Sequence, residues 1–167
     1  NLKTLLSAEH VKNAAVGGQY YFAPQMTGVS NHVLIVRKDW MRDWAVSKDK
    51  AEDYYPVTLS EFTDMLTYFH TENKGNYSDG TFGLGLNENF DFTEDFLSAF
   101  GISPSYTKKE DGTYVLSAQT AEYDDYIEWL NNGTSEGYIY PYFGGVTESA
   151  TADNFKAGKI GAFVTTC

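Results

Sequence analysis

The sequence predicts an α/β fold, because segments typical of strands alternate with segments typical of amphipathic helices. Val33–Val36 is a continuous aliphatic run, as expected of a strand buried in a parallel or mixed sheet. Thr58 stands three residues before Glu61, which is the spacing of a helix capping box, and apolar residues follow on one helical face. A chain of 167 residues is long enough to bury one core.

The middle of the chain repeats the order strand, loop, helix. Thr81–Leu86 is predicted to be a strand, in which Gly83 and Gly85 mark places where another backbone or a ligand approaches closely. A polar loop follows, and Thr93 is placed to cap a helix over Glu94–Phe100. This repeated order favours helices packed on a sheet.

The remaining segments extend the same reading. Asp111-Gly112 indicates a hairpin turn within Ser105–Ala118. Thr120–Asn131 is predicted to be a helix that buries Tyr123, Ile127 and Leu130. The other expected elements are a lead-in helix within residues 2–14 that Gly17-Gly18 ends, a surface excursion over Asp43–Tyr55, a short helix near Thr151–Lys156 and a strand over Ile160–Val164.

Composition narrows the function classes. The formal net charge of −11, with scattered Lys and Arg, argues against nucleic acid as a partner. Aromatic residues make up 16% of the chain, and the 13 tyrosines offer apolar rings with polar tips, which suit sugars. Cys167 is the only cysteine, so no internal disulfide can form.

The sequence offers little for catalysis. The three histidines lie far apart, without metal-ligand spacing, and no nucleophile elbow or phosphate-binding loop is present. One enzymatic alternative stays open, a glycoside hydrolase that uses Glu88 and Asp91 in the loop after the third strand. Asn89 and Phe90 in the same loop fit hydrogen bonding and stacking of a polar ligand better.

The loop over residues 72–80 is rich in oxygen-bearing side chains, as calcium loops are. It lacks the acidic residues at alternate positions that a calcium site requires, so a turn is the preferred interpretation. We therefore expect neither a metal nor a cofactor.

Six segments resemble motifs of the family 1 extracellular solute-binding proteins of ABC transporters, and they follow one another along the chain in the same order as in that family. The helix segment PVTLSEFTDMLTYF at Pro56–Phe69 is similar to the family's PTTxDEFxxxLKAF. The segment DGTYVLSAQTAEYDDYIEWLNNGTSEGYIYP at Asp111–Pro141 resembles DGKxVxxxxxPEYKEALKxLNKLYKEGLIDP. The other four segments are GQYYFAP at Gly18–Pro24, VLIVRKDW at Val33–Trp40, FLSAFG at Phe96–Gly101 and FKAGKIGAF at Phe155–Phe163.

The resemblance implies a lobe of the type II periplasmic-binding-protein kind, three-layered α/β/α with a mixed sheet. It implies that residues 1–17 are a lead-in helix at the border of the amino-terminal lobe and that residues 18–167 form the core of an incomplete carboxy-terminal lobe. A hinge would lie near Pro24, and VLIVRKDW would be the strand that returns from it. The opening Asn1-Leu2-Lys3 also suggests an excised piece of a longer protein.

The resemblance also implies a function and a ligand site. The protein would be the binding component of an importer, not an enzyme, and would carry a small solute of the carbohydrate or oligosaccharide class to a membrane permease. It would act as a monomer outside the bacterial cell, in a lipid-anchored parent. A non-transport surface domain that binds carbohydrate is a further alternative. The ligand residues carried over by position are Gln25, Met26, Asn89, Asp91, Phe92 and Glu148.

Overall fold

A computed structural model describes residues 12, 15–20, 32–90 and 93–166 of the chain. The chain divides into two units, Asn1–Asn31 and His32–Cys167. In the first unit, β1 (Ala15–Val16) pairs antiparallel with β2 (Gln19–Tyr20). The turn between them uses Gly17 and Gly18 at φ values of 59° and 81°, which glycine adopts without steric cost. The hinge predicted near Pro24, and all of the lead-in helix predicted within residues 2–14 except residue 12, fall outside the described set.

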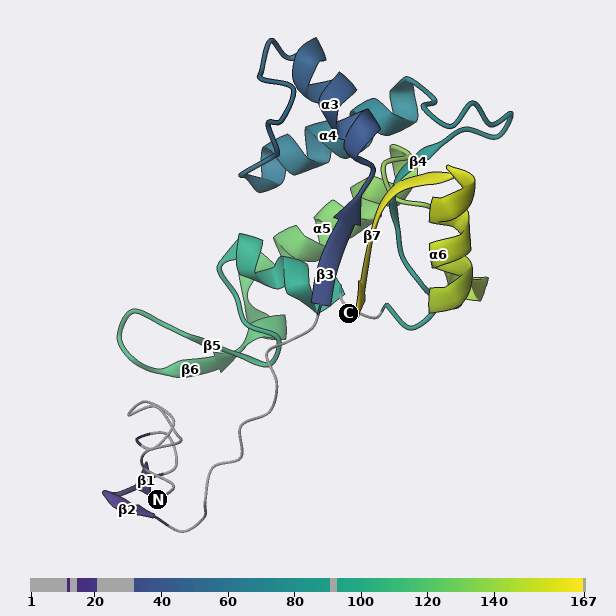
Figure 1. Ribbon diagram of the computed structural model, residues 1–167. Coiled ribbons are helices and arrows are strands. Elements are labelled where there is room, and N and C mark those ends of the chain that lie inside the picture. The colour runs from purple at the N-terminus through teal and green to yellow at the C-terminus, as the bar shows by residue number, and fades with distance from the viewer. Residues whose placement is uncertain (1–11, 13–14, 21–31, 91–92, 167) are drawn as a thin grey trace, which may run out of the picture. The chain divides into compact units, whose positions relative to one another are not determined.

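The second unit is built on a mixed sheet of three strands in the order β3-β7-β4 (Figure 1). β3 (His32–Val36) runs antiparallel to β7 (Ile160–Thr166), and β4 (Phe82–Gly85) runs parallel to β7. On its other side β4 bridges Ile139 through Leu84. The predicted α/β class and mixed sheet are confirmed.

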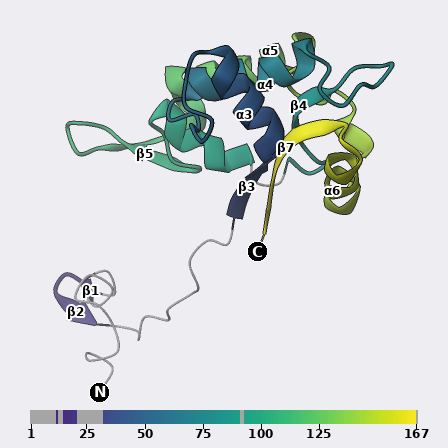
Figure 2. The ribbon, with the colours of Figure 1, turned by 45° about the horizontal axis from the view of Figure 1, so that its top comes forward.

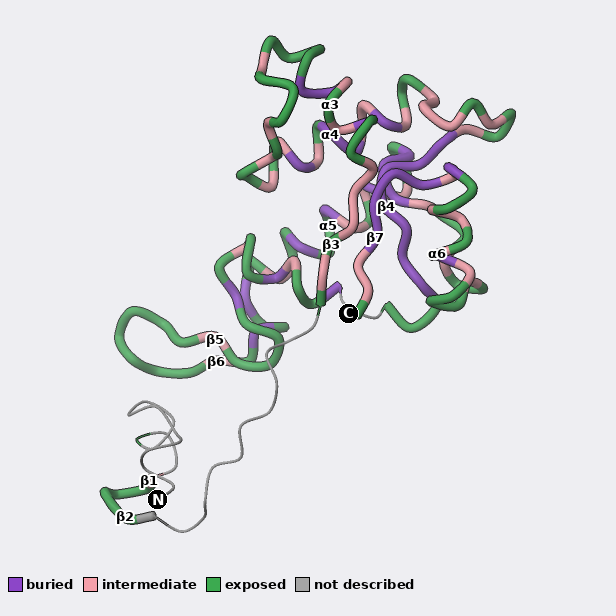
Figure 3. The backbone as a smooth tube through the Cα atoms, viewed as in Figure 1, coloured by how far each residue is buried: buried purple, intermediate pink, exposed green. Residues whose placement is uncertain are grey.

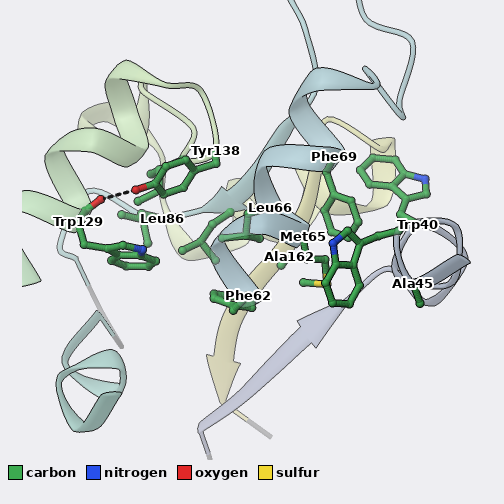
Figure 4. Packing of buried hydrophobic residues seen from close by; sticks show 13 residues of the cluster. Trp40, Ala45, Phe62, Met65, Leu66, Phe69, Leu86, Trp129, Tyr138 and Ala162 are labelled. Carbon is green, nitrogen blue, oxygen red and sulfur yellow. Dashed lines mark hydrogen bonds between the residues drawn. The ribbon is translucent and has the colours of Figure 1, made fainter. Parts of the chain in front are cut away.

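Three helices cover one face of this sheet: α3 (Lys38–Ser47), α4 (Leu59–Thr71) and α5 (Ala121–Ser135). Their buried side chains form one apolar cluster with residues of β4 and β7, shown in Figure 4. Within it the hydroxyl of Tyr138 donates to the carbonyl oxygen of Trp129 at 2.9 Å, so this buried polar group is satisfied. Figure 3 shows the buried residues gathered at the sheet and at the helix faces turned toward it.

The other face of the sheet carries α6 (Glu148–Ala157). Phe155 of α6 packs on a second cluster made by Phe82, Ile160 and Phe163. Figures 1 and 2 show α6 on the opposite side of the sheet from α3 and α4. The lobe therefore has three layers, helices, sheet and helix.

The predicted cap at the start of α4 is present, but the reciprocal hydrogen bond of the capping box reaches Val57, one residue before the N-cap Thr58. The Thr58 hydroxyl accepts from the amide of Glu61 at 3.1 Å, and the Glu61 carboxylate accepts from the amide of Val57 at 3.0 Å. Glu61 also accepts hydrogen bonds from the ammonium group of Lys50 and from the hydroxyl of Tyr54. The hydrogen bond from Lys50, followed by those from Val57 and Tyr54, lowers the pKa of Glu61 from 4.5 to about 2.

Two expectations for the segment after β3 are wrong. The strand ends at Val36, so it does not continue to Trp40. The predicted surface excursion from Asp43 is helical as far as Ser47, within α3. The buried residues Trp40 and Trp44 lie four apart and share one helical face, which the charged residues between them conceal in the sequence.

The predicted buried face of α5 is also partly wrong. Tyr126 and Trp129 are buried, whereas Ile127 is 47% exposed. Tyr123 and Leu130 lie at the margin of the buried face, with intermediate exposure. The helix is therefore oriented with Tyr126 and Trp129 toward the core and Ile127 toward solvent. The acidic residues Glu122, Asp124, Asp125 and Glu128 are exposed, as expected.

The segment between β4 and α5 contains short elements. A 3₁₀ helix, η1 (Thr93–Phe100), stands where an α-helix is predicted, and the Thr93 hydroxyl donates to the carbonyl of Phe90 instead of capping. The predicted hairpin is present as β5 (Tyr106–Lys108) and β6 (Tyr114–Leu116). Two further 3₁₀ turns are η2 (Ser117–Gln119) and η3 (Phe143–Gly145).

The close approach predicted at the glycines of β4 is made by the protein itself. A Cβ atom on Gly83 would lie 2.6 Å from Leu66 Cβ and 2.7 Å from the backbone carbonyl oxygen of Tyr138. One on Gly85 would lie 2.2 Å from Ile160 Cδ1. These glycines let β4 pack directly against α4 and β7.

Among the described helices, none combines the length and the apolar character needed to cross a bilayer.

Candidate functional site

The loop that leaves the carboxyl end of β4 is organised around one buried amide side chain. Asn87 is 5% exposed, and its Oδ1 accepts from the amide of Asn89 at 3.2 Å. Its carbonyl oxygen accepts from the amide of Phe90 at 3.1 Å. Asn87 therefore fixes the loop from inside, while Glu88 and Asn89 extend into solvent. Ligands of open α/β sheets bind at this end of the strands.

Phe90 has an uncommon backbone conformation. Its φ is 55°, in the left-handed region, where a bulky residue costs on the order of 1–3 kcal/mol. The Phe90 carbonyl accepts from the amide and from the hydroxyl of Thr93, at 3.2 and 2.8 Å. Phe90 as a whole is 42% exposed, and its ring meets Phe143 edge to face, with centroids 4.8 Å apart. The surrounding contacts thus hold a strained residue with an aromatic surface open to solvent.

The segment before α6 adjoins this loop. The Val146 carbonyl accepts from the amide of Glu88 at 2.8 Å. The Thr151 hydroxyl donates to the carbonyl of Leu86 at 3.1 Å, which fixes the first turns of α6 at the end of β4. Glu148 begins α6, and its Oε1 accepts from the Thr165 hydroxyl of β7 at 2.8 Å. Two loops far apart in the sequence therefore form one surface.

A small cavity of about 10 Å³ lies beneath this surface. That volume holds about one water molecule and is too small for a sugar ring. A carbohydrate could therefore contact the loops only from the open side. The cavity is lined by Gly85, Leu86, Asn87, Thr93, Phe96, Glu148, Thr151 and Val164.

The structure describes two of the six predicted ligand residues. Asn89 lies on the loop after β4 and Glu148 lies at the start of α6, and both are exposed at the surface formed by the two loops. The other four, Gln25, Met26, Asp91 and Phe92, lie outside the described residues. A ligand role for any of the six remains a prediction.

The glycosidase alternative finds no support in the surroundings of Glu88. Its side chain is exposed, whereas the general acid of a glycoside hydrolase is typically enclosed by apolar groups. Its predicted partner Asp91 lies outside the described residues.

The loop over residues 72–80 is held by hydrogen bonds from its own side chains and from Thr81 and Lys159. Asn73 Oδ1 accepts from the amide of Tyr77 at 3.2 Å and from the hydroxyl of Thr81 at 2.7 Å. Lys159 Nζ donates to Asp79 at 2.6 Å, and this hydrogen bond lowers the pKa of Asp79. Within the described part of the chain, no three His, Cys, Asp or Glu residues lie where they could hold a metal ion.

Sequence reasoning missed the contribution of the segment before α6. Tyr142 is 67% exposed, and Phe143 packs against both Phe90 and the main core. The available signal is the pair of aromatic residues between Pro141 and Gly144, because apolar rings inside a turn sequence indicate a surface that contacts something.

Comparisons with known proteins identify the relatives of this lobe. No family model matches the sequence. A curated relative, the polygalacturonan/rhamnogalacturonan-binding protein YtcQ of Bacillus subtilis, is 24% identical over an alignment 160 residues long, which covers 92% of this chain and 30% of the relative. A solved structure of an HMO-binding, ABC-transporter-associated solute-binding protein from Bifidobacterium longum infantis matches 82% of this chain with a TM-score of 0.58 and 16% identity. The chain is thus similar in sequence to a polysaccharide-binding protein and similar in fold to a solute-binding protein associated with an ABC transporter.

A second solved solute-binding protein matches almost all of the chain. The ABC substrate-binding protein Lmo0181 from Listeria monocytogenes, in complex with cycloalternan, covers 97% of this chain with a TM-score of 0.55 and 17% identity. At these identities the two solved structures establish only the fold. They show that this chain has the same fold as the matched parts of both proteins. The chain spans only 30% to 38% of the length of these three proteins.

Proposed function

We propose that this chain is a lobe of a solute-binding protein that captures a carbohydrate for an ABC importer. The observation that carries the proposal is the surface at the carboxyl end of β4. There the exposed ring of Phe90 lies in the same loop as the polar side chains of Glu88 and Asn89, beside Glu148. Sugars require this combination, because their ring faces stack on aromatic rings and their hydroxyls form hydrogen bonds.

A carbohydrate fits the site better than a fully apolar ligand. The cavity below the loops is too small to enclose a ligand, so binding depends on an open, polar surface. The names of the three relatives, two of them as binding proteins of polysaccharides or oligosaccharides and one as a complex with a cyclic oligosaccharide, support the same class.

The open surface also favours capture between two lobes. One lobe leaves half of a bound sugar in water, whereas closure of a second lobe over it would bury most of the ligand. We propose that a second lobe completes the site in a protein of the relatives' length, together with Gln25, Met26, Asp91 and Phe92 of this chain. The same proposal includes a permease as partner, a location outside the cell, a lipid anchor on the parent and action as a monomer.

The proposal is tested by a thermal-shift titration of this chain with oligogalacturonides and with neutral oligosaccharides. A ligand at 100 times its dissociation constant should stabilise the protein by about 2.7 kcal/mol, because it binds only the folded state. We expect a rise in the unfolding temperature with at least one sugar and no rise for Phe90→Ala at the same concentration. No shift with any sugar would contradict the proposal. Release of reducing ends by the chain, abolished in Glu88→Gln, would favour the glycosidase instead.

A further inference from the structure

The lobe carries most of its positive charges at one end of the sheet. Of the twelve Lys and Arg residues of the chain, ten lie in the unit His32–Cys167. Eight of the ten follow the end of β3 or precede the start of β4 or β7, which places them at the end of the sheet opposite the candidate site. Those after β3 are Arg37, Lys38, Arg42, Lys48 and Lys50, and those before β4 or β7 are Lys74, Lys156 and Lys159. Figure 1 shows α3 and the start of β7 together at this end.

The other two cations of this unit lie in the β5–β6 hairpin. Lys108 and Lys109 are followed directly by Glu110 and Asp111, which offset their charge. Figures 1 and 2 show the hairpin projecting from the lobe, away from α6. The two loops of the candidate site, residues 86–93 and 141–148, contain neither Lys nor Arg.

Two exposed carboxylates lie on these loops instead. Glu88 extends from the loop after β4, and Glu148 begins α6. Oε1 of Glu148 accepts from the Thr165 hydroxyl, so this side chain is held near the end of β7. An ionised carboxylate accepts hydrogen bonds and donates none. Both side chains therefore suit a ligand that offers hydroxyl donors.

The residues that follow the loop after β4 add negative charge. Glu94 and Asp95 are exposed in the first turn of η1, and Thr93 directly before them lines the cavity beneath the site. His32, at the start of β3, has its Nδ1 3.0 Å from Asp95, so any positive charge on this ring is shared with that carboxylate. Among the described residues, the end of the sheet that carries the candidate site is therefore acidic.

We propose that the site at the end of β4 takes uncharged sugars and discriminates against uronic acids. This inference rests on the proposed function, because it specifies the ligand of the same site. A neutral sugar presents hydroxyl hydrogens to Glu88 and Glu148 and a ring face to Phe90. The carboxylate of a uronate has no hydrogen to donate and is repelled by both acidic side chains.

This specificity differs from the one in the name of the curated relative. That name includes polygalacturonan, which is an acidic polymer. Recognition of a carboxylate ordinarily uses Arg or Lys, and the two loops of this chain have neither. One fold can carry different ligand residues in its loops, and the two sequences are only 24% identical. The ligand of this lobe therefore differs in charge from that polymer.

The test compares matched ligands in a thermal-shift titration of the 167-residue chain, which measures the contribution of this lobe alone. Each galacturonate oligomer is paired with its methyl ester, which has the same rings without the charge, and neutral glucose and galactose oligomers complete the set. We expect the tightest neutral ligand to bind at least about tenfold more tightly than any free acid at low ionic strength. Added salt should narrow this ratio, because it screens exposed charges.

Two double variants show which carboxylates cause the discrimination. Glu88→Gln/Glu148→Gln removes two charges at the site, keeps the side-chain size and should narrow the ratio roughly threefold or more. Glu52→Gln/Glu72→Gln is the matched control, because it removes two exposed charges that follow α3 and α4, away from the site loops. It should leave the ratio unchanged. An unchanged unfolding temperature without ligand shows that each variant is folded.

A free acid that binds as tightly as the best neutral ligand would overturn the specificity while the proposed function stands. A ratio that Glu88→Gln/Glu148→Gln leaves unchanged would do the same. No thermal shift with any ligand would contradict the proposed function itself.

Charged nitroxide probes measure the potential of the site without any sugar. We expect a cationic nitroxide to relax the amide hydrogens of Glu88, Asn89 and Phe90 more strongly than an anionic one, because the acidic surface attracts it. The difference should shrink in Glu88→Gln/Glu148→Gln. Stronger relaxation by the anionic probe would overturn the inference whether or not a sugar binds, which separates its failure from a failure of the proposed function.

Discussion

The ring of Phe90 meets the ring of Phe143 at an interplanar angle of 67°, with centroids 4.8 Å apart. This contact joins the loop after β4 to the segment before α6, and it accompanies the hydrogen bond from the amide of Glu88 to the carbonyl of Val146. Phe90 holds a left-handed backbone conformation while it makes this contact. The structure therefore keeps an exposed aromatic ring in place at a cost in backbone energy, which is a pattern of binding sites.

The strain at Phe90 predicts an unusual order of stability among its variants. Both Phe90→Ala and Phe90→Gly lose the contact with Phe143, but only glycine adopts a φ of 55° without penalty. We expect Phe90→Gly to be more stable than Phe90→Ala by about 1–2 kcal/mol, measured by urea unfolding. An alanine variant as stable as the glycine variant would show that the position is not strained.

The ion pair at the start of α4 predicts a pH-dependent stability. The pKa of Glu61 is about 2 in the folded protein and 4.5 when unperturbed, so its charged form stabilises the fold above pH 4.5. This contribution is lost as the pH falls from 4.5 toward 2. We expect wild type to be more stable than Glu61→Gln by a constant amount above pH 4.5, and the difference to shrink below it. Urea unfolding across this pH range measures the difference, and a gap independent of pH would contradict the assignment.

The close packing of Gly83 predicts a large effect of one methyl group. A Cβ atom there would lie 2.6 Å from the carbonyl oxygen of Leu66, and backbone cannot move aside easily. We expect Gly83→Ala to destabilise the protein by about 1–3 kcal/mol. Gly144→Ala is the matched control, because no atom lies within 4 Å of its added Cβ. Equal unfolding free energies for the two variants would show that β4 is not packed as described.

The orientation of α5 predicts a large loss of stability at one residue and a small change at the next. Tyr126 is 4% exposed and contacts Phe100 edge to face, whereas Ile127 is 47% exposed. We expect Tyr126→Ala to cost about 3–5 kcal/mol and Ile127→Ala to change stability by about 0.5 kcal/mol or less. Thermal unfolding of the two variants measures the two losses of stability. A larger loss for Ile127→Ala than for Tyr126→Ala would contradict this orientation and support the buried face predicted from the sequence.

Local patterns in the sequence predicted the elements whose signals are uninterrupted. The aliphatic run of β3, the helix cap of α4 and the Asp111-Gly112 turn all lie where expected. Prediction failed where charged residues conceal a buried face. Trp40 and Trp44 define α3, yet Lys, Asp and Arg residues surround them in the sequence.

The candidate site was harder to predict because it depends on contacts between distant segments. The loop of Asn89 follows a strand, and its position at the sheet edge could be expected from the fold class. The junction of Glu88 with Val146 and the packing of Phe90 on Phe143 have no local signature. Only the folded chain shows that the segment before α6 belongs to the same surface.

The most direct test of the central claim is a map of amide chemical-shift changes in the isotope-labelled chain during titration with the sugar that gives the largest thermal shift. The account predicts changes concentrated in Leu86–Phe90 and in Tyr142–Glu148, with the same changes absent in Phe90→Ala. Changes confined to other parts of the lobe, or the same changes in Phe90→Ala, would contradict a carbohydrate site at the end of β4.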